Sequence, residues 1–453
     1  MKEATLEMIA APHHRMTENK VGDSLEQAAS PDQQERPADI ITLVLTADNH
    51  LGYTAFGQHP RKREEQQQGL RRAFQQATDF AIGQGVDLFV QAGDLFDSTS
   101  PGERDISFVS TCLAQLSQAG VRVFAIGGTR DTPAETRLML GEAPVGAQFI
   151  VPQASFAQSG VMHYFAPNRA EVEPVMLNIR DVQVSICGLG VLPRQERDPL
   201  AFMKEQRETE RAAVSLLLLH APIEGLTTDT TLLDNRTQIS RGSIENQSLY
   251  RYILAGYHHN YQHLHIGHCE VIVAGATQRI DFSNPEQEPG FVFLGLAADG
   301  IRWCKHIAVD SPKLQRLLIE TGELWTEERY TTGSTTTDVI IERLQPLCSH
   351  EAMVQLQLAG TLTRNQYHQL DLNQIRRYGE EHCFALAIDD SGLEILPEQE
   401  AISAETGERF SPREELMALA DEWIDAARDE QEKKVLRATK EDLLAAMDEV
   451  KRR

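Results

Sequence analysis

Ile40-Ile41-Thr42-Leu43-Val44-Leu45 is the stretch that decides the fold. This continuous run is rich in β-branched residues, which is typical of a strand buried on both faces of a sheet. Apolar residues then recur at helical spacing over 62–83, and a second strand is predicted at 86–91. A helix with apolar residues from Ile106 to Leu116 and a strand at 121–126 follow. The order β-α-β-α-β predicts an α/β fold.

The rest of the chain divides by pattern. Short apolar runs that read as strands continue to about residue 308, so 39–308 is predicted to be one α/β domain. Mixed segments predict a small α+β unit over 309–397. Residues 1–38 lack apolar periodicity and predict a disordered tail. Residues 398–453 read as a linker and a helical arm, because Ser411-Pro412-Arg413-Glu414 is a helix start.

Composition narrows the class of protein. The chain has 453 residues and a net charge of −24, which excludes a histone-like polycation. Contact with nucleic acid would therefore require a local basic patch or a bound metal. Six cysteines without a CxxC pair argue against a zinc ribbon and a secreted disulfide scaffold. No apolar run approaches the ~20 residues of a membrane span and no signal peptide opens the chain, so we expect a cytoplasmic protein without a membrane segment.

Candidate ligands follow five of the predicted strands. Carboxylates and imidazoles at the carboxyl ends of neighbouring strands can converge on a divalent ion such as Mn²⁺, with Zn²⁺ or Fe²⁺ as alternatives. Each element alone also fits a solvated loop, a turn or a buried core histidine. The joint occurrence favours a metal site that polarises a phosphoryl oxygen. The elements are Asp48-Asn49-His50, Gly93-Asp94-Leu95-Phe96-Asp97, Gly127-Gly128-Thr129-Arg130-Asp131, His220 and Gly256-Tyr257-His258-His259.

This order of motifs resembles the calcineurin-like metallophosphoesterases, and within them the SbcD-type nuclease subunits of double-strand-break repair complexes. Further support comes from 275–282 and from Gly290-Phe291-Val292. The resemblance implies a two-sheet α/β sandwich with a two-Mn²⁺ site over 39–308, a small α+β capping domain, and C-terminal helices that dock on an SbcC-type, SMC-like ATPase.

The resemblance also assigns ligands. The four ligands of the first ion are all present, and two ligands of the second ion are replaced. Thr129 stands where the family has Asn, and Tyr257 stands where it has His. Both are poor ligands for Mn²⁺, so one Mn²⁺ site is expected and the second is in doubt. The first set is Asp48, His50, Asp94 and His259, and the second retains Asp94 and His220.

The catalytic histidine of the family is replaced by Arg130, whose guanidinium cannot transfer a proton but can neutralise a phosphate. The alternative is that Arg130 forms a structural ion pair with Asp131. His258 could substitute for the missing imidazole, as could the histidines at 263–268, although these also fit a solvated strand edge. The candidate catalytic residues are Arg130, Asp131 and His258.

Two functions from different classes remain open. One is an Mn²⁺-dependent exonuclease that acts on DNA ends with the SMC-like ATPase. The other is a catalytically weakened scaffold for an ATPase, such as a HerA-type translocase, in DNA processing or anti-phage defence. A small-molecule phosphoesterase is a weaker third option. A homodimer through helices of the first half is a family expectation.

Two surfaces are candidates for binding. Arg61, Lys62 and Arg63, with Arg71 and Arg72 nearby, form a basic cluster that could meet DNA phosphates or could be a solvated helix start. The arm's apolar face, which includes Leu416, Trp423 and Ile424, could grip a partner protein or pack on the capping domain.

Overall fold

The computed structural model describes residues 39–55, 59–133, 151–166, 173–191, 211–226, 238–280, 288–324 and 335–396, and single positions or short runs at 200, 209, 282 and 417–440. The predicted disordered tail and the helix start at Ser411 lie outside the described residues.

The first sheet is built around the stretch that opens the ordered chain. Strand β1 (Ile41–Thr46) is buried along its whole length and pairs in parallel with β2 (Leu88–Ala92). Strand β2 pairs in parallel with β3 (Arg122–Ile126), and β3 with β4 (His163–Phe165). On the other side, β1 pairs antiparallel with β11 (Gly290–Ala297), which pairs with β12 (Gly300–Ala308). The order β12-β11-β1-β2-β3-β4 puts the predicted β1 at the centre.

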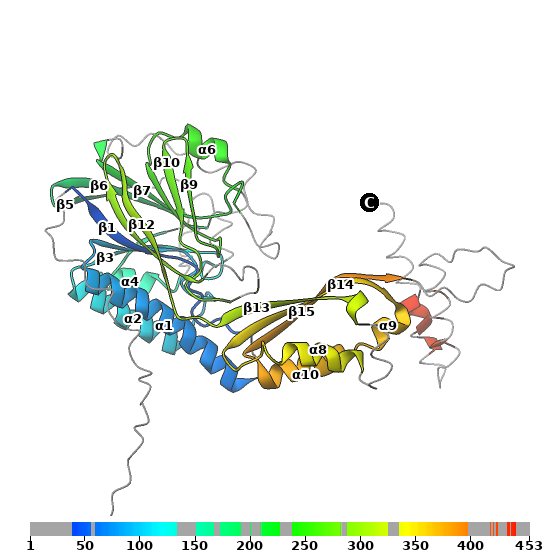
Figure 1. Ribbon diagram of the computed structural model, residues 1–453. Coiled ribbons are helices and arrows are strands. Elements are labelled where there is room, and N and C mark those ends of the chain that lie inside the picture. The colour runs from blue at the N-terminus through cyan, green and yellow to red at the C-terminus, as the bar shows by residue number, and fades with distance from the viewer. Residues whose placement is uncertain are drawn as a thin grey trace, which may run out of the picture. The chain divides into compact units, whose positions relative to one another are not determined.

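Two helices cover one face of this sheet. Helix α1 (Pro60–Gln84) begins with proline in its first turn and ends at Gly85, whose left-handed backbone lets its N–H bond the last carbonyls. Helix α2 (Glu103–Gln118) lies beside it (Figure 1). Their apolar faces pack on the outer side chains of the sheet, including Val44 and Phe89. The helix predicted over 62–83 is confirmed.

The second sheet packs on the opposite face of the first. Its strand order is β5-β6-β7-β8-β10-β9, and β6, β7 and β8 run in parallel. One core cluster contains Leu43 of the first sheet together with Leu216 and Leu254 of the second, so the two sheets form a sandwich. The predicted two-sheet α/β sandwich is confirmed. The strands are β5 (Val175–Ile179), β6 (Val182–Leu189), β7 (Val214–His220), β8 (Tyr252–Gly256), β9 (Gln262–Ile266) and β10 (Cys269–Val273).

A third sheet has the order β13-β14-β15 and belongs to the region predicted as α+β. The chain forms two compact units, of which the second comprises 320–337, 358–371 and 390–453. The predicted boundaries at 308 and 397 remain predictions. Cys348 and Cys383 form a disulfide within the first unit. The remaining elements are α4 (Ala154–Gln158), α6 (Arg241–Asn246), β13 (Lys313–Glu320), α8 (Thr336–Leu344), β14 (Ala352–Thr363), α9 (Arg364–His368), α10 (Leu372–His382) and β15 (Ala385–Leu396).

No helix within the described residues is long and apolar enough to cross a membrane.

Candidate metal centre

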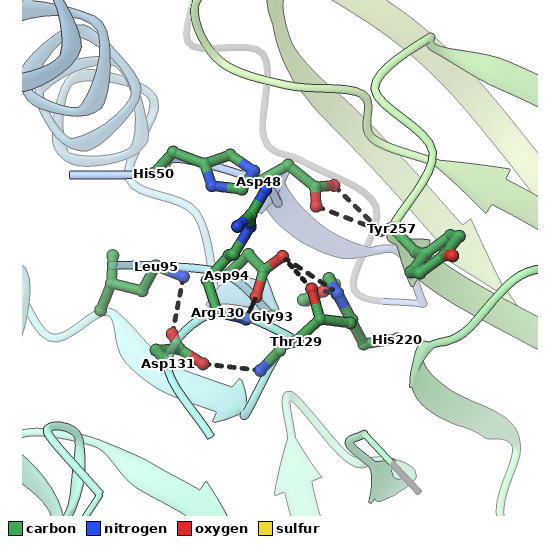
Figure 2. A network of polar contacts seen from close by, with 12 residues as sticks. Asp48, His50, Gly93, Asp94, Leu95, Thr129, Arg130, Asp131, His220 and Tyr257 are labelled. Atoms are coloured by element: carbon green, nitrogen blue, oxygen red, sulfur yellow. Dashed lines mark hydrogen bonds and ion pairs between the residues drawn. The ribbon is translucent and has the colours of Figure 1, made fainter. Parts of the chain in front are cut away.

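The candidate ligands gather at the carboxyl ends of strands from both sheets. Asp48 and His50 follow β1, Asp94 follows β2, and His220 is the last residue of β7. His259 follows β8. Parallel strands present their carboxyl ends at one edge, so residues far apart in sequence meet there. Figure 2 shows Asp48, Asp94 and His220 converging from these separate segments.

The backbone at this edge is held in an unusual conformation. Asp48, His50, Asp94 and Tyr257 all have positive φ angles, of 48°, 47°, 52° and 81°. Residues other than glycine rarely adopt positive φ angles, and those that do cluster at functional sites. Four neighbouring residues with this conformation indicate that the loops are shaped to aim side chains inward.

The first group of potential ligands is Asp48, His50 and His259, whose donor atoms lie within 4.8 Å of one another. Nδ1 of His50 lies 3.1 Å from Oδ1 of Asp97. Nε2 of the same ring is buried without a hydrogen-bond partner among the described residues. A buried nitrogen left open beside a carboxylate and a second imidazole is what a divalent ion would occupy.

The second group is Asp48, Asp94 and His220, all buried. Thr129 Oγ1 donates to Asp94 Oδ2 at 2.9 Å, and the backbone N–H of Arg130 donates to Oδ1 at 2.6 Å. Nε2 of His220 lies 3.4 Å from Asp94 Oδ2 (Figure 2). Nδ1 of His220 lies 2.8 Å from the carbonyl of Ala92. These contacts turn Asp94 toward His220. Asp48 is therefore the residue common to both groups, whereas the resemblance implies Asp94.

The charges in the second group are strongly coupled. Burial opposes ionisation of Asp94, but the charges of His220 and His50, together with hydrogen bonds from His220 and the backbone of Arg130, outweigh burial and hold the pKa of Asp94 below its usual value. Burial acts to lower the pKa of His220, but the carboxylates of Asp94 and Asp48 and the hydrogen bond with Ala92 together raise it to about 9. Burial raises the pKa of Asp48. Because a divalent ion competes with the proton on His220, the affinity of the centre for an ion falls as the pH falls.

The replaced ligand positions have structural roles of their own. The hydroxyl of Thr129 is used on Asp94, as described above. The backbone N–H of Tyr257 donates to both carboxylate oxygens of Asp48, at 3.2 and 3.0 Å. The Tyr257 ring meets the rings of His220 and His258 edge-on, with centroids 5.8 and 5.5 Å apart. Tyr257 thus orients Asp48 through its backbone and puts a phenol ring where the family has an imidazole.

Arg130 does not pair with Asp131, so the structural alternative for Arg130 is wrong. Its side chain is 55% exposed, and Nε lies 4.0 Å from Oδ1 of Asp97. Asp131 is instead buried and accepts hydrogen bonds from Leu95 N and Gly128 N, at 2.9 and 2.7 Å. Burial raises the pKa of Asp131 to about 6. Asp131 links the loop after β2 to the loop after β3, and its catalytic role remains a prediction.

His258, the candidate substitute for the missing imidazole, has a hydrogen-bond partner of its own. Its ring is buried, and Nε2 accepts a hydrogen bond from the backbone N–H of Ile223 at 3.1 Å. His263 and His265 lie on β9 and contact the two carboxylate oxygens of Glu270, at 2.9 and 3.1 Å. His263 and His265 therefore fit the strand-edge interpretation, and a catalytic role for His258 remains a prediction.

The basic cluster is partly dispersed. Nζ of Lys62 donates to the carbonyls of Glu380 and Cys383, at 2.6 and 2.8 Å, and so caps the end of α10 rather than facing a phosphate. Arg71 is buried and bonds Asp105 at 2.7 Å. Both cations form contacts within the chain, and a contact of Lys62 with DNA phosphates remains a prediction. Arg61, Arg63 and Arg72 are exposed, and their contact with DNA remains a prediction.

The predicted partner-binding arm is described at few positions. Leu416 lies outside the described residues. Trp423 is 59% exposed, whereas Ile424 is buried. A role for the arm in partner binding remains a prediction.

A buried amide network that the sequence does not predict supports the site. Gln91 Nε2 donates to Asn49 Oδ1 at 3.2 Å and to the carbonyl of Gly93 at 2.8 Å. Asn49 Nδ2 donates to Thr277 Oγ1 at 3.0 Å. Three loops that carry or flank ligands are thereby linked. The only signal in the sequence is a polar Gln91 within an otherwise apolar strand.

Gly128 is expected to tolerate no side chain, because a Cβ there would overlap the backbone nitrogen and Oδ1 of Asp94. We expect Gly128→Ala to lower the free energy of unfolding by ~1–3 kcal/mol, the usual cost of overpacking, and to weaken Mn²⁺ binding because Asp94 must move. Urea denaturation and calorimetric Mn²⁺ titration measure both effects. Gly83→Ala is the matched control, since nothing lies within 4 Å of its Cβ position on α1. Equal behaviour of the two variants would contradict the close approach.

The two-sheet sandwich, with carboxylates and imidazoles at its strand ends, is similar to the arrangement expected of the calcineurin-like metallophosphoesterases. Within that class, the chain is similar to the DNA double-strand break repair protein Mre11. It is 33% identical over 97 residues to Mre11 of Methanosarcina mazei, covering 21% of this chain and 15% of that protein. It is 23% identical over 324 residues to Mre11 of Halobacterium salinarum, covering 71% of each chain. The predicted resemblance to a repair metallophosphoesterase is confirmed.

The similarity to solved structures is weak. A solved structure of a dimetal phosphatase from Danio rerio is 12% identical and covers 57% of this chain and 93% of that one, with a TM-score of 0.33. No family model matches the chain. Because the match to the Methanosarcina mazei protein spans only 15% of its length, the activity, substrate and partners of this chain are proposals.

Proposed function

We propose that the chain is a metal-dependent phosphodiesterase that processes DNA ends in a repair complex with an ATPase. The observation that carries this proposal is the pair of ligand groups that share Asp48, with an open nitrogen on His50 and with His220 beside Asp94. Oxygen and imidazole donors suit Mn²⁺ among the divalent ions, and we expect Mn²⁺ to be the native ion. The similarity to Mre11 proteins supports DNA as the substrate.

The candidate ligands and Arg130 have different roles in the proposed reaction. A bound divalent ion supplies Lewis-acid polarisation of a phosphoryl oxygen and of water. Asp48, His50 and His259 hold the ion of the first group, while Asp94 and His220 complete the second group with Asp48. The exposed guanidinium of Arg130 follows β3 at the same edge and neutralises the phosphate by paired hydrogen bonds. Because a guanidinium keeps its proton, the chain relies on charge neutralisation more than on proton transfer.

The partner and the compartment follow from the same proposal. An SMC-like ATPase of the SbcC type is the first candidate partner, and a HerA-type translocase is the alternative. The arm over 398–453 is the proposed contact. We expect the complex in the cytoplasm.

A weakened scaffold is the second candidate, and a specific observation favours it. The three positions that depart from the family carry Thr129, Arg130 and Tyr257, and His258, the residue best placed to compensate, is bonded to Ile223. General acid–base catalysis contributes ~10²–10⁴-fold. A chain that lacks this help can retain the ion and the fold while it turns over slowly.

Cleavage of linear duplex DNA by the full chain tests the proposal. With Mn²⁺ present, we expect release of nucleotides from end-labelled linear duplex, little release from covalently closed circles, and none with EDTA. We expect His263→Ala to cleave like the natural chain, because His263 lies on β9 and contacts Glu270 rather than a candidate ligand. If the chain binds the ion but cleaves no DNA, the proposed phosphodiesterase activity is wrong and the scaffold function is favoured. If cleavage persists in EDTA, the proposed metal dependence is wrong.

A further inference from the structure

The carboxylate of Asp97 lies between the first ligand group and the guanidinium of Arg130, which is the candidate phosphate clamp. Oδ1 of Asp97 is 3.1 Å from Nδ1 of His50 and 4.0 Å from Nε of Arg130. The three residues come from three different loops, after β1, β2 and β3. Asp97 is 25% exposed, so it stands at the border between the buried ligands and solvent.

The contact with His50 determines what its other nitrogen can do. A carboxylate beside Nδ1 favours the tautomer with the proton on Nδ1, which leaves the lone pair on Nε2. That nitrogen is buried and open, and it belongs to the group with Asp48 and His259. A carboxylate partner also fixes the ring orientation and makes the ring a stronger ligand. Asp97 is therefore placed to prepare His50 for an ion.

The contact with Arg130 is looser. At 4.0 Å, with the Arg130 side chain 55% exposed, it is a weak, solvent-screened ion pair. A weak pair restrains a guanidinium near the site without holding it away from a phosphate. The backbone N–H of Arg130 donates a hydrogen bond to Asp94, which fixes the position from which the side chain extends.

We propose that Asp97 is a positioning residue that couples the metal ligand His50 to Arg130, so that ion affinity and the placement of the phosphate clamp depend on one carboxylate. This inference rests on the proposed function for the role of Arg130, and on ion binding alone for the role of His50. It assigns Asp97 a contact with neither substrate nor ion.

Two variants of the full chain separate the roles. Asp97→Ala removes the acceptor for His50, and we expect it to weaken Mn²⁺ binding ~10–100-fold, as loss of such outer partners does. Asp97→Asn keeps a neutral acceptor at the same place, so most of the Mn²⁺ affinity should return. Isothermal titration with Mn²⁺ measures both. Asp299→Ala is the matched control, because Asp299 forms an ion pair with Arg302 at 2.7 Å outside the site.

Kinetics on linear duplex DNA test the Arg130 side. We expect Asp97→Asn and Arg130→Ala each to raise KM more than they lower kcat, because both act on binding of the phosphate. The double variant should show little more than the larger single effect, since coupled residues are not additive. Additive effects on KM would overturn the coupling to Arg130. Mn²⁺ affinity of Asp97→Ala equal to that of the natural chain would overturn the coupling to His50.

Failure of the proposed function gives a different result. If the natural chain binds Mn²⁺ but cleaves no DNA, the proposed phosphodiesterase activity is wrong, and so is the Arg130 part of the inference. The titrations with Mn²⁺ still decide whether Asp97 acts on His50. If the natural chain binds no Mn²⁺, both the proposed function and the inference are overturned.

Discussion

Asp94→Ala is expected to reduce Mn²⁺-dependent cleavage of DNA to the level seen in EDTA. Asp94 is a buried member of the second ligand group and is the acceptor for both Thr129 and the backbone of Arg130. Its removal takes away a ligand and releases the loop that carries the phosphate clamp. Loss of several kcal/mol of charge stabilisation corresponds to on the order of 10³-fold in rate. We also expect at least one fewer Mn²⁺ per chain by elemental analysis.

A second variant guards against simple misfolding. Asp94→Asn preserves the volume and an acceptor oxygen for Arg130 N, so the fold should persist while the negative charge is lost. Thermal unfolding monitored by circular dichroism checks that both variants fold. Asp299→Ala should behave like the natural chain. Cleavage by folded Asp94→Asn at the natural rate would show that the second ligand group does not act in the reaction.

The fold could be predicted because its core elements carry strong local signals. Strand β1 is a continuous β-branched run and is buried at every position, and α1 has a long helical period with a glycine at its end. Strand β9 could be predicted only as one of two alternatives, because an edge strand with alternating exposed histidines resembles a solvated loop. Residues that supply ligands followed predicted strands, and the shared geometry of parallel strand ends accounts for their convergence.

The partners of individual side chains could not be predicted in the same way. Lys62 bonds the carbonyl of Cys383, which is 321 positions away in sequence. His258 could be placed near the site, but its hydrogen bond with Ile223 depends on the packing of a separate loop. Asp97 lies within a motif that the sequence shows, yet only the loop geometry puts it between His50 and Arg130. The sequence therefore indicated which residues form the candidate site, and the structure shows the contacts that each of them makes.

Restoring the three family residues should accelerate cleavage. The variant Thr129→Asn, Arg130→His, Tyr257→His is expected to turn over ~10²-fold faster than the natural chain, or more, because a positioned imidazole supplies acid–base help worth that much. An amide oxygen at 129 would arise where a hydroxyl already lies 2.9 Å from Asp94. An imidazole at 257 would stand beside His220 on backbone that already bonds Asp48.

Single replacements separate the contributions of these positions. Arg130→His alone should raise kcat and introduce a pH dependence from an imidazole, at the expense of KM as the guanidinium is lost. Tyr257→His and Thr129→Asn should instead increase the number of Mn²⁺ ions bound. Because the three residues act on one site, the triple variant should exceed the product of the single effects. A folded triple variant that binds two Mn²⁺ ions but cleaves no faster would show that these substitutions are not what limits the natural chain. The limiting step would then have to be sought in DNA binding or in the ATPase partner.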